Sequence, residues 1–402
     1  MEVKPGYKQT EVGVIPEDWN VHKLRSCLSA PPDYGINAPA VPFSGRLPAY
    51  IRITDITEDG RFSPGSPVSV NRADAHRYYL NDGEIVLART GASVGKSYLY
   101  SPKDGKLVFA GFLIRVRPDT SKLVPAYLAA YVATGAYRNW VRLMSMRSGQ
   151  PGINGNEYGQ LPIPLPPTIG EQRAIAGALS DADALIGALD QLIAKKRDLK
   201  QAAMQQLLTG QTRLPGFHGE WEVKTLQEST ECLDRVRIPL NETQRAQMKG
   251  DYPYCGANGV LDFVNGYVID DDIILMAEDG GYFDEYETRP IAYRMQGKCW
   301  VNNHAHILKA KADYDQGFIF YSLVHKNILP FLASGTRAKL NKSEMNKIAV
   351  RVPKDLPEQT AIAEALSDMD AELAALEQRR DKTRALKQGM MQELLTGRTR
   401  LV

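Results

Sequence analysis

The stretch EQRAIAGALSD, residues 171–181, returns as EQTAIAEALSD at residues 358–368, 187 positions later. The register then holds without a gap to the end of each copy, where LLTG at 207–210 matches LLTG at 394–397. The tripeptide Thr-Arg-Leu follows both copies after one more residue. Self-similarity at one fixed offset is the signature of a duplicated unit. The sequence therefore predicts a pseudo-two-fold tandem repeat.

Each copy of the repeated stretch has the spacing of an amphipathic helix. Apolar side chains recur at intervals of four and three residues, the pattern of a coiled-coil seam. These residues are Ile175, Leu179, Ala182, Ile186, Leu189 and Ile193 in the first copy, and Ile362, Leu366, Met369, Leu373 and Leu376 in the second. Gly210 and Gly397 mark the helix ends. A helix over 171–208 is about 57 Å long, so we expect the two copies to cover each other as an intramolecular antiparallel coiled coil.

The rest of the chain has the texture of an α+β fold. Short β-rich runs at 84–88, 107–110 and 272–276 predict strands, and 127–132 and 318–323 predict short helices. We expect two globular domains separated by the two long helices. The expected boundaries are 1–170 for the first domain, 171–213 for the central helix, 214–357 for the second domain and 358–402 for the C-terminal helix. Two unrelated helices on separate cores are the alternative, which the gap-free repeat disfavours.

Composition limits the kinds of partner. The chain has 402 residues with 49 basic and 47 acidic side chains, a net charge of +2, so any nucleic-acid surface must be a local patch. Residues 1–170 hold 19 basic and 14 acidic residues, whereas 214–357 hold 17 and 20. No apolar run is long enough for a membrane span, and the N-terminus lacks the apolar core of a secretory leader. Four scattered cysteines fit a reduced, cytoplasmic protein without structural zinc.

Motifs for catalysis are incomplete. The run 91–97, GASVGKS, resembles a phosphate loop, but the first glycine of a Walker A motif would have to stand at Thr90. The run 30–34, APPDY, has the wrong order for an adenine-methyltransferase loop, and no G-x-G-x-x-G accompanies it. His304 and His306 are too few for a zinc site, so a DNA-facing role and a place in the core both remain open. The sequence predicts no catalytic residue, no cofactor and no metal in this chain.

Three loops carry groups that suit DNA. The glycine-rich turn offers Arg89, Thr90, Ser93 and Lys96 for close approach to a phosphate, although a plain hairpin turn explains it too. The loops before the shared asparagine combine Ser-Gly stretches with basic and amide groups, which reach phosphates and base edges. Their candidate residues are Arg147, Gln150 and Asn154 in the first copy, and Arg337, Lys339 and Asn341 in the second. His304 and His306 complete the predicted DNA-binding set.

The chain resembles the specificity subunit of type I restriction–modification enzymes. The resemblance is carried by the two E-Q-x-A-I-A helices with their LLTG-x-TRL ends, by IPLPP at 163–167 and by ARTGASVGK at 88–96. It implies that each globule is a target recognition domain for one half of a split DNA site. It also implies two modification subunits that bind S-adenosylmethionine, and restriction subunits that use ATP and magnesium. That chemistry is expected on the partners and not in this chain.

Two interpretations of function follow. The first is a DNA-binding subunit that directs the complex to a bipartite target, while the paired helices set the spacing and dock the modification subunits. The second is a coiled-coil assembly scaffold without DNA contact, which the near-neutral charge allows. Two dissimilar β-rich globules favour the first, because a scaffold gains little from globules that differ.

Overall fold

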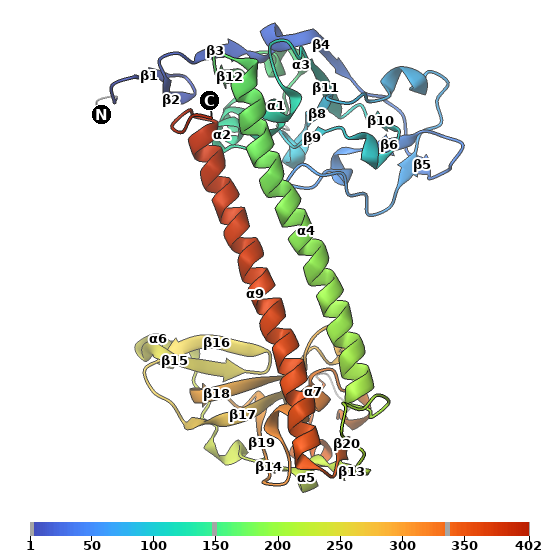
Figure 1. Cartoon of the computed structure of the whole chain (residues 1–402), viewed down its shortest axis with the longest axis vertical. Coiled ribbons are helices and arrows are strands. Elements are labelled where there is room, and N and C mark those ends of the chain that lie inside the picture. The colour runs from blue at the N-terminus through green and yellow to red at the C-terminus, as the bar shows by residue number, and fades with distance from the viewer. Residues whose placement is uncertain (1–3, 147–150, 334–337, 402) are drawn as a thin grey trace. The chain divides into compact units, whose positions relative to one another are not determined.

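The computed structural model describes residues 4–146, 151–333 and 338–401 (Figure 1). The chain forms two compact units: unit 1 comprises residues 1–190 and 379–402, and unit 2 comprises residues 191–378. Each unit therefore combines one globule with a part of both long helices. The four-segment boundaries drawn from the sequence stay a prediction. Within the described ranges, no helix is both long and apolar enough to cross a membrane.

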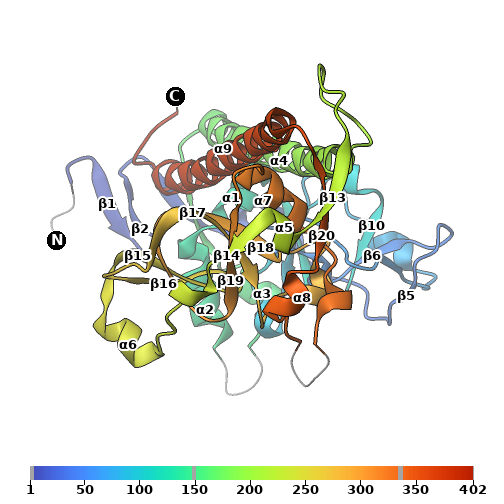
Figure 2. The ribbon, with the colours of Figure 1, turned by 90° about the horizontal axis from the view of Figure 1, so that it is seen from below.

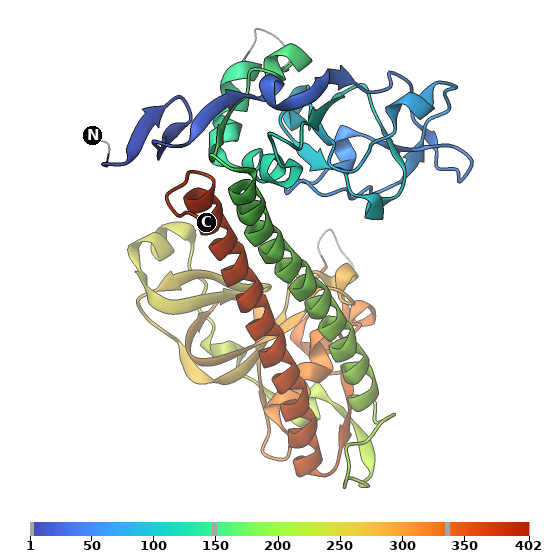
Figure 3. The same ribbon diagram turned by 45° about the horizontal axis from the view of Figure 1, so that its top comes forward.

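The two longest elements are the repeated helices α4 (Ile169–Leu207) and α9 (Leu356–Leu394), of 39 residues each. At 1.5 Å per residue each is about 58 Å long. In unit 1 and in unit 2 alike, a segment of α4 runs antiparallel beside a segment of α9 (Figures 1 and 3). The predicted seam is buried, including Ile175, Leu179, Ile186, Leu189, Ile193, Ile362, Leu366 and Leu373. The predicted α+β fold with an antiparallel coiled coil is confirmed.

Ion pairs join the two helices within each unit. In unit 1, Asp183 pairs with Lys387 at 2.7 Å, and Asp190 contacts Arg384 at 3.1 Å. In unit 2 the pairs are Lys196–Glu372, Arg197–Glu377 and Lys200–Asp370. Each exposed pair contributes about 0–1 kcal/mol. Their main effect is to favour one alignment of the helices over others.

A buried carboxylate closes each end of the helix pair. Glu358, at the start of α9, is fully buried and accepts two bonds from Arg213, which follows α4, at 2.5 and 2.6 Å. Glu171, at the start of α4, accepts the equivalent pair from Arg400 at 2.5 and 2.8 Å. The glutamate of one repeat is thus neutralised by the arginine of the other. Two-point guanidinium–carboxylate contacts are short and directional, so they fix how the helices meet.

The glutamine beside each of these glutamates ties the long helix to its own globule. Gln172 accepts from the Val124 amide at 2.9 Å and donates to the Lys122 carbonyl at 3.0 Å. Gln359 accepts from the Asp315 amide, also at 2.9 Å. Val124 and Asp315 are the N-cap residues of α1 (Pro125–Tyr131) and α7 (Gln316–Val324). In each copy, the glutamate therefore binds the arginine that follows the other long helix, and the glutamine binds the adjoining globule.

The glycines that both repeats share after the long helices adopt the left-handed backbone conformation. Gly210 has φ +68° and Gly397 has φ +69°, values that L side chains rarely adopt. A Cβ atom on Gly397 would lie 2.5 Å from Pro16, and one on Gly210 would lie 3.2 Å from the Trp221 ring. Backbone conformation and close approach together explain why both copies of the LLTG motif end in glycine.

Over its described residues, unit 1 contains two four-stranded sheets and two strand pairs. The first sheet has the order β4 (Leu28–Tyr34), β11 (Leu113–Pro118), β8 (Ile85–Ala88), β9 (Ser97–Leu99). The second has the order β10 (Leu107–Phe109), β6 (Ala49–Ile51), β7 (Val68–Ser69), β5 (Val41–Pro42). The pairs are β1 (Tyr7–Thr10) with β2 (Gly13–Pro16), and β3 (Asn20–Lys23) with β12 (Pro162–Leu165). The shorter helices, besides α1, are α2 (Gly135–Ser145) and α3 (Gly155–Tyr158).

In the part of unit 2 that the structure describes, the strands form one six-stranded sheet and one strand pair. Figure 2 shows these strands from below. The sheet has the order β14 (Thr230–Cys232), β19 (Ala305–Ala310), β17 (Ile269–Ala277), β18 (Ala292–Val301), β15 (Lys249–Gly256), β16 (Gly259–Val264). The pair is β13 (Trp221–Thr225) with β20 (Ala349–Pro353). The shorter helices, besides α7, are α5 (Leu226–Ser229), α6 (Glu242–Gln247) and α8 (Lys342–Met345).

The two globules share a common frame. The strands β4, β8, β9 and β11 have the spatial order 1-4-2-3, and β14, β17, β18 and β19 have the same order. Ala88 pairs with Leu113 in unit 1, and Ala277 pairs with Ala305 in unit 2. The two globules differ outside these four strands. Unit 1 has a second, separate sheet, whereas unit 2 extends its four-stranded frame with β15 and β16. The predicted strands and short helices lie at β8, β10, β17, α1 and α7.

We predict that Arg213→Ala lowers the free energy of unfolding by about 3 kcal/mol, because it leaves the Glu358 carboxylate buried without its partner. Arg197→Ala is the matched control, since it removes an exposed pair from the same two helices and is expected to cost about 0.5 kcal/mol or less. Urea unfolding followed by circular dichroism compares the two. Equal effects would contradict the closing role of Arg213.

Candidate nucleic-acid interface

The strands β8 in unit 1 and β17 in unit 2 are equivalent. The residue that follows each of them, at a place we call the edge of that unit, makes backbone hydrogen bonds to a neighbouring segment on either side. In unit 1 the Arg89 amide donates to the Phe112 carbonyl at 3.0 Å, and the Ile153 amide donates to the Arg89 carbonyl at 2.9 Å. In unit 2 the Glu278 amide donates to His304 at 2.9 Å, and Leu340 donates to Glu278 at 2.7 Å. Arg89 and Glu278 therefore occupy the same place in the frame. The side chains of Arg89 and Glu278 themselves carry opposite charge.

The unit 1 edge is cationic and aromatic. The Arg89 guanidinium lies over the Tyr34 ring, 4.8 Å from its centroid, and Tyr34 is 40% exposed. The Tyr34 hydroxyl accepts a bond from the Gly155 amide at 3.0 Å, and Phe112, whose carbonyl accepts from the Arg89 amide, is exposed. Thr90 bridges to Gly152. Within the part of the chain that the structure describes, Nε of Arg89 is buried without a hydrogen-bond partner. A stacked guanidinium suits phosphates and base edges.

The unit 2 edge is an ion network. Glu278 binds Arg237 at 2.5 Å and Lys339 at 2.9 Å. His304, whose side chain is 43% exposed, contacts Asp279 at 2.5 Å. Burial would raise the pKa of Glu278, but the bonds from Arg237 and Lys339 hold it below its usual value. This edge presents cations that are already partly neutralised, which differs from the chemistry at Arg89.

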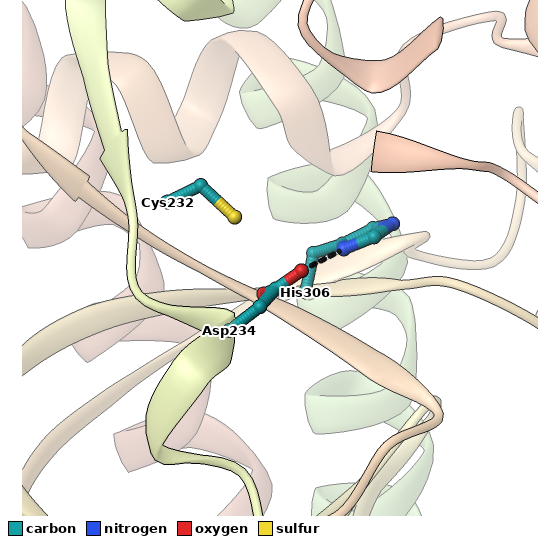
Figure 4. A group of neighbouring side chains, drawn as sticks. All are labelled: Cys232, Asp234 and His306. Atoms are coloured by element: carbon teal, nitrogen blue, oxygen red, sulfur yellow. Dashed lines mark hydrogen bonds and ion pairs between the residues drawn. The ribbon is translucent and has the colours of Figure 1, made fainter. Parts of the chain in front are cut away.

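His306 is 1% exposed and contacts Asp234 (Figure 4). Its other ring nitrogen contacts the Leu340 carbonyl. Cys232, Asp234 and His306 place three potential metal ligands within 4.8 Å of one another. However, Nδ1 of His306 lies 2.7 Å from Oδ2 of Asp234, a hydrogen-bond distance, whereas two ligands of one zinc ion lie roughly 3.3 Å apart. Arg237 also contacts that carboxylate oxygen, at 3.2 Å. The arrangement fits a shared proton better than a cation.

The residues predicted at the glycine-rich turn, Arg89, Thr90, Ser93 and Lys96, do not all lie together in the structure. The turn joins β8 to β9 as a hairpin, whereas a phosphate loop opens a helix. Arg89 and Thr90 lie at the edge described above. Lys96 instead pairs with Glu58 at 2.7 Å and, like Gly91 and Gly95, lines a cavity of about 660 Å³ in unit 1. Ser93 is half-buried in the turn. The predicted cluster is thus brought together only in part.

The loop residues have different roles. Asn154 caps α3: its side chain accepts from the Glu157 amide at 2.9 Å, and Glu157 bonds back. Asn341 stands at the equivalent N-cap of α8, is exposed, and makes no side-chain capping bond. Lys339 is exposed at the unit 2 edge. Arg147, Gln150 and Arg337 lie outside the described residues.

Sequence reasoning missed the partners of the candidate residues. Tyr34, Phe112, Arg237 and Glu278 were not singled out, although Tyr34 lies in the APPDY stretch that was set aside as a methyltransferase-like motif. A usable signal was present, because Arg89 and Glu278 each come directly after a strongly apolar strand. Comparing the residues that follow equivalent strands would have found both.

The chain matches the family model described as "Type I restriction modification DNA specificity domain" twice, over residues 44–195 and 218–384. The chain belongs to this family. As a specificity subunit it recognises a DNA target and is not itself catalytic. The resemblance drawn from the sequence is confirmed, and no observation favours a scaffold without DNA contact.

Two proteins named as putative type I restriction enzyme specificity subunits are similar to the chain over different lengths. The MjaX specificity subunit of Methanocaldococcus jannaschii is 26% identical over 425 aligned positions, covering 98% of this chain and 97% of that protein. The S.HindORF215P specificity subunit of Haemophilus influenzae is 35% identical over 158 residues, which is 39% of each chain. The second match therefore spans well under half of that relative.

Solved structures share the fold. The S subunit of a type I restriction–modification system from M. genitalium superposes with a TM-score of 0.67 and 15% identity, covering 98% of both chains. A chain from a study of complex assembly and conformational transition in a type I system gives 0.53 and 16%, covering 95% of this chain and 99% of that one. At these identities the likeness concerns architecture alone.

We predict that Asn154→Ala lowers the free energy of unfolding by about 1 kcal/mol, because the capping bonds of α3 are lost. Asn341→Ala, at the same repeat position, is the matched control and is expected to change it by less than about 0.5 kcal/mol. Urea titration of both variants gives the comparison. A larger loss for Asn341→Ala than for Asn154→Ala would show that this assignment is wrong.

Proposed function

We propose that the chain directs a type I restriction–modification complex to a bipartite DNA target, with each globule reading one half-site. The observation that carries this proposal is the pair of equivalent edges with opposite chemistry, Arg89 in unit 1 and Glu278 in unit 2. One frame with two different edges suits a target whose halves differ in sequence. Since that target is the DNA of the cell, the complex would act in the cytoplasm.

The helices suit the role of a spacer. Elements that read the same groove face one helical turn apart are separated by about 34 Å, and a helix pair of about 58 Å can span that separation. Bonds at both ends of the pair, from Arg213 and Arg400, would keep its length fixed. The gap between half-sites would then follow from helix length.

The exposed face of α4 suits partner subunits. Leu185, Leu192 and Leu199 recur every seven residues and are exposed. A line of leucines on a long helix is typical of a docking surface for another protein. We assign it to two modification subunits, which would bind S-adenosylmethionine. ATP and magnesium would serve restriction subunits where these are present.

The DNA contacts proposed for unit 1 are centred on Arg89 and Thr90, with Asn154 behind them as a cap. Ser93 and Lys96 would reach only phosphates along the hairpin, because Lys96 is held by Glu58. In unit 2 the proposed contacts are His304, Lys339 and Asn341. Arg147, Gln150 and Arg337 remain proposed on sequence grounds. His306 is too deeply buried for a direct contact, so we keep it out of this set.

We predict that Arg89→Gln weakens target binding by the assembled complex about 10- to 100-fold, the size expected for one specific base contact. Arg61→Gln is the control, since it removes the same charge from an exposed pair with Asp59 in unit 1. Fluorescence anisotropy with the mapped target and with single-half variants measures both. Discrimination should relax in one half-site only; an Arg89→Gln variant that behaves like the control would refute the placement.

A further inference from the structure

We propose that His306 is a positioning residue for DNA recognition by unit 2, joining the segment after β14 to the loop that carries Lys339 and Asn341. This inference rests on the proposed function, because it explains how that loop is held in place for a half-site. His306 does not touch DNA in this account. It acts through the backbone of Leu340.

Both ring nitrogens of His306 act as donors. Nε2 lies 2.8 Å from the Leu340 carbonyl oxygen, which can only accept, so Nε2 carries a hydrogen. Nδ1 lies 2.7 Å from Oδ2 of Asp234, and the other oxygen of Asp234 accepts from the Ile307 amide at 2.9 Å. An imidazole that donates from both nitrogens is an imidazolium. It therefore links a fixed carboxylate to the loop backbone.

The loop is anchored at this point by three further contacts. The Leu340 amide donates to Glu278, the Ala333 amide donates to the Lys339 carbonyl at 2.8 Å, and the Lys339 ammonium binds Glu278. The backbone carbonyl of Leu340 accepts a hydrogen bond from Nε2 of His306. Residues 339–341 are thus held from both sides of the chain, next to the exposed Lys339 and Asn341. Losing the imidazolium would free one side of the anchor.

The charges around His306 favour the imidazolium. Asp234 and Glu278 are the facing acids, at 2.7 and 3.7 Å, while Arg237, Lys339 and the Cys232 thiol are the other ionisable groups nearby. Burial alone would lower the pKa of His306, but its bonds to Asp234, Cys232 and the Leu340 carbonyl raise that pKa to about 9. Burial would raise the pKa of Asp234, but the bond from His306 holds it below its usual value.

The sign of the pH effect follows from this. The folded state holds the proton more tightly than an unfolded chain does, where a histidine has a pKa near 6.5. The stability that the imidazolium contributes is therefore fully present below about pH 6.5. His306 stays protonated at neutral pH, and the contribution is lost as the pH rises through about 9.

Unit 1 provides an internal comparison. His306 pairs with Met276 in β17, and the equivalent residue of β11 is Ile114, which pairs with Leu87 in β8. Ile114 is buried and cannot titrate. A charged histidine in an apolar position of the frame is therefore a feature of the second globule alone among these equivalent positions. Recognition by unit 1 should not share its pH dependence.

The first experiment reads the protonation of His306 in the full chain. Long-range ¹H–¹⁵N spectra of histidine-labelled protein, assigned with His306→Gln, should show both ring nitrogens protonated at pH 7.5 and a transition near pH 9. One protonated nitrogen at pH 7.5 would overturn the proposal. So would stoichiometric binding of added zinc, lost in Cys232→Ser, since Nδ1 would then hold a metal and not a proton. This readout does not depend on DNA.

The second experiment tests positioning in the assembled complex. His306→Gln should speed amide exchange in residues 338–341 by about tenfold or more, and it should relax discrimination in one half-site while the other is unchanged. The unaltered chain is expected to lose discrimination between pH 7.5 and 9.5, and this loss should be absent from the variant. His325→Gln, elsewhere in unit 2, is the control. Normal exchange with normal discrimination would overturn the proposal. If the unaltered complex shows no sequence preference, the proposed function fails, whereas the spectra still decide the state of His306.

Discussion

The crossed glutamate–arginine pairs are the interaction on which the rest of the structure depends. Each glutamate begins one long helix and is almost fully buried, and the arginine that neutralises it follows the end of the other helix. A buried carboxylate without its partner is strongly unfavourable. The helices can satisfy both glutamates only when they run antiparallel with their ends aligned. The neighbouring glutamines then join each helix to its globule, so one short motif links the long helices to each other and to the globules.

On this scaffold, we propose that specificity arises from side chains at one place in a shared frame. The same pair of backbone bonds holds Arg89 in unit 1 and Glu278 in unit 2. Around Arg89 the frame presents Tyr34 and Phe112, whereas around Glu278 it presents Arg237, Lys339 and His304. A duplicated fold can therefore carry two unlike reading surfaces without altering its core. The added strands β15 and β16 in unit 2, and the second sheet in unit 1, change the surroundings further.

The repeat, the long helices and the α+β texture could be predicted because periodicity and self-similarity are written in the sequence. The spacing also located Asn154 and Lys339, but not what they do. Asn154 caps a helix, and this depends on Glu157 bonding back to it. His306 was left open between core and surface, since a strand pattern does not reveal that Asp234 and Leu340 flank it. Contacts between residues far apart in sequence, such as Arg89 with Tyr34, have no periodic signal.

The central proposal is that a helix pair of fixed length would hold two different reading surfaces at a set separation. The most direct measurement maps methylated adenines in the DNA of cells that carry the complex, with the natural chain and with four residues inserted into both helices, after Ala194 and after Glu377. Four residues add about 6 Å, which is about two base pairs. The account predicts a two-part target whose halves are unchanged and whose gap grows by that amount. An unchanged gap with full methylation would contradict it.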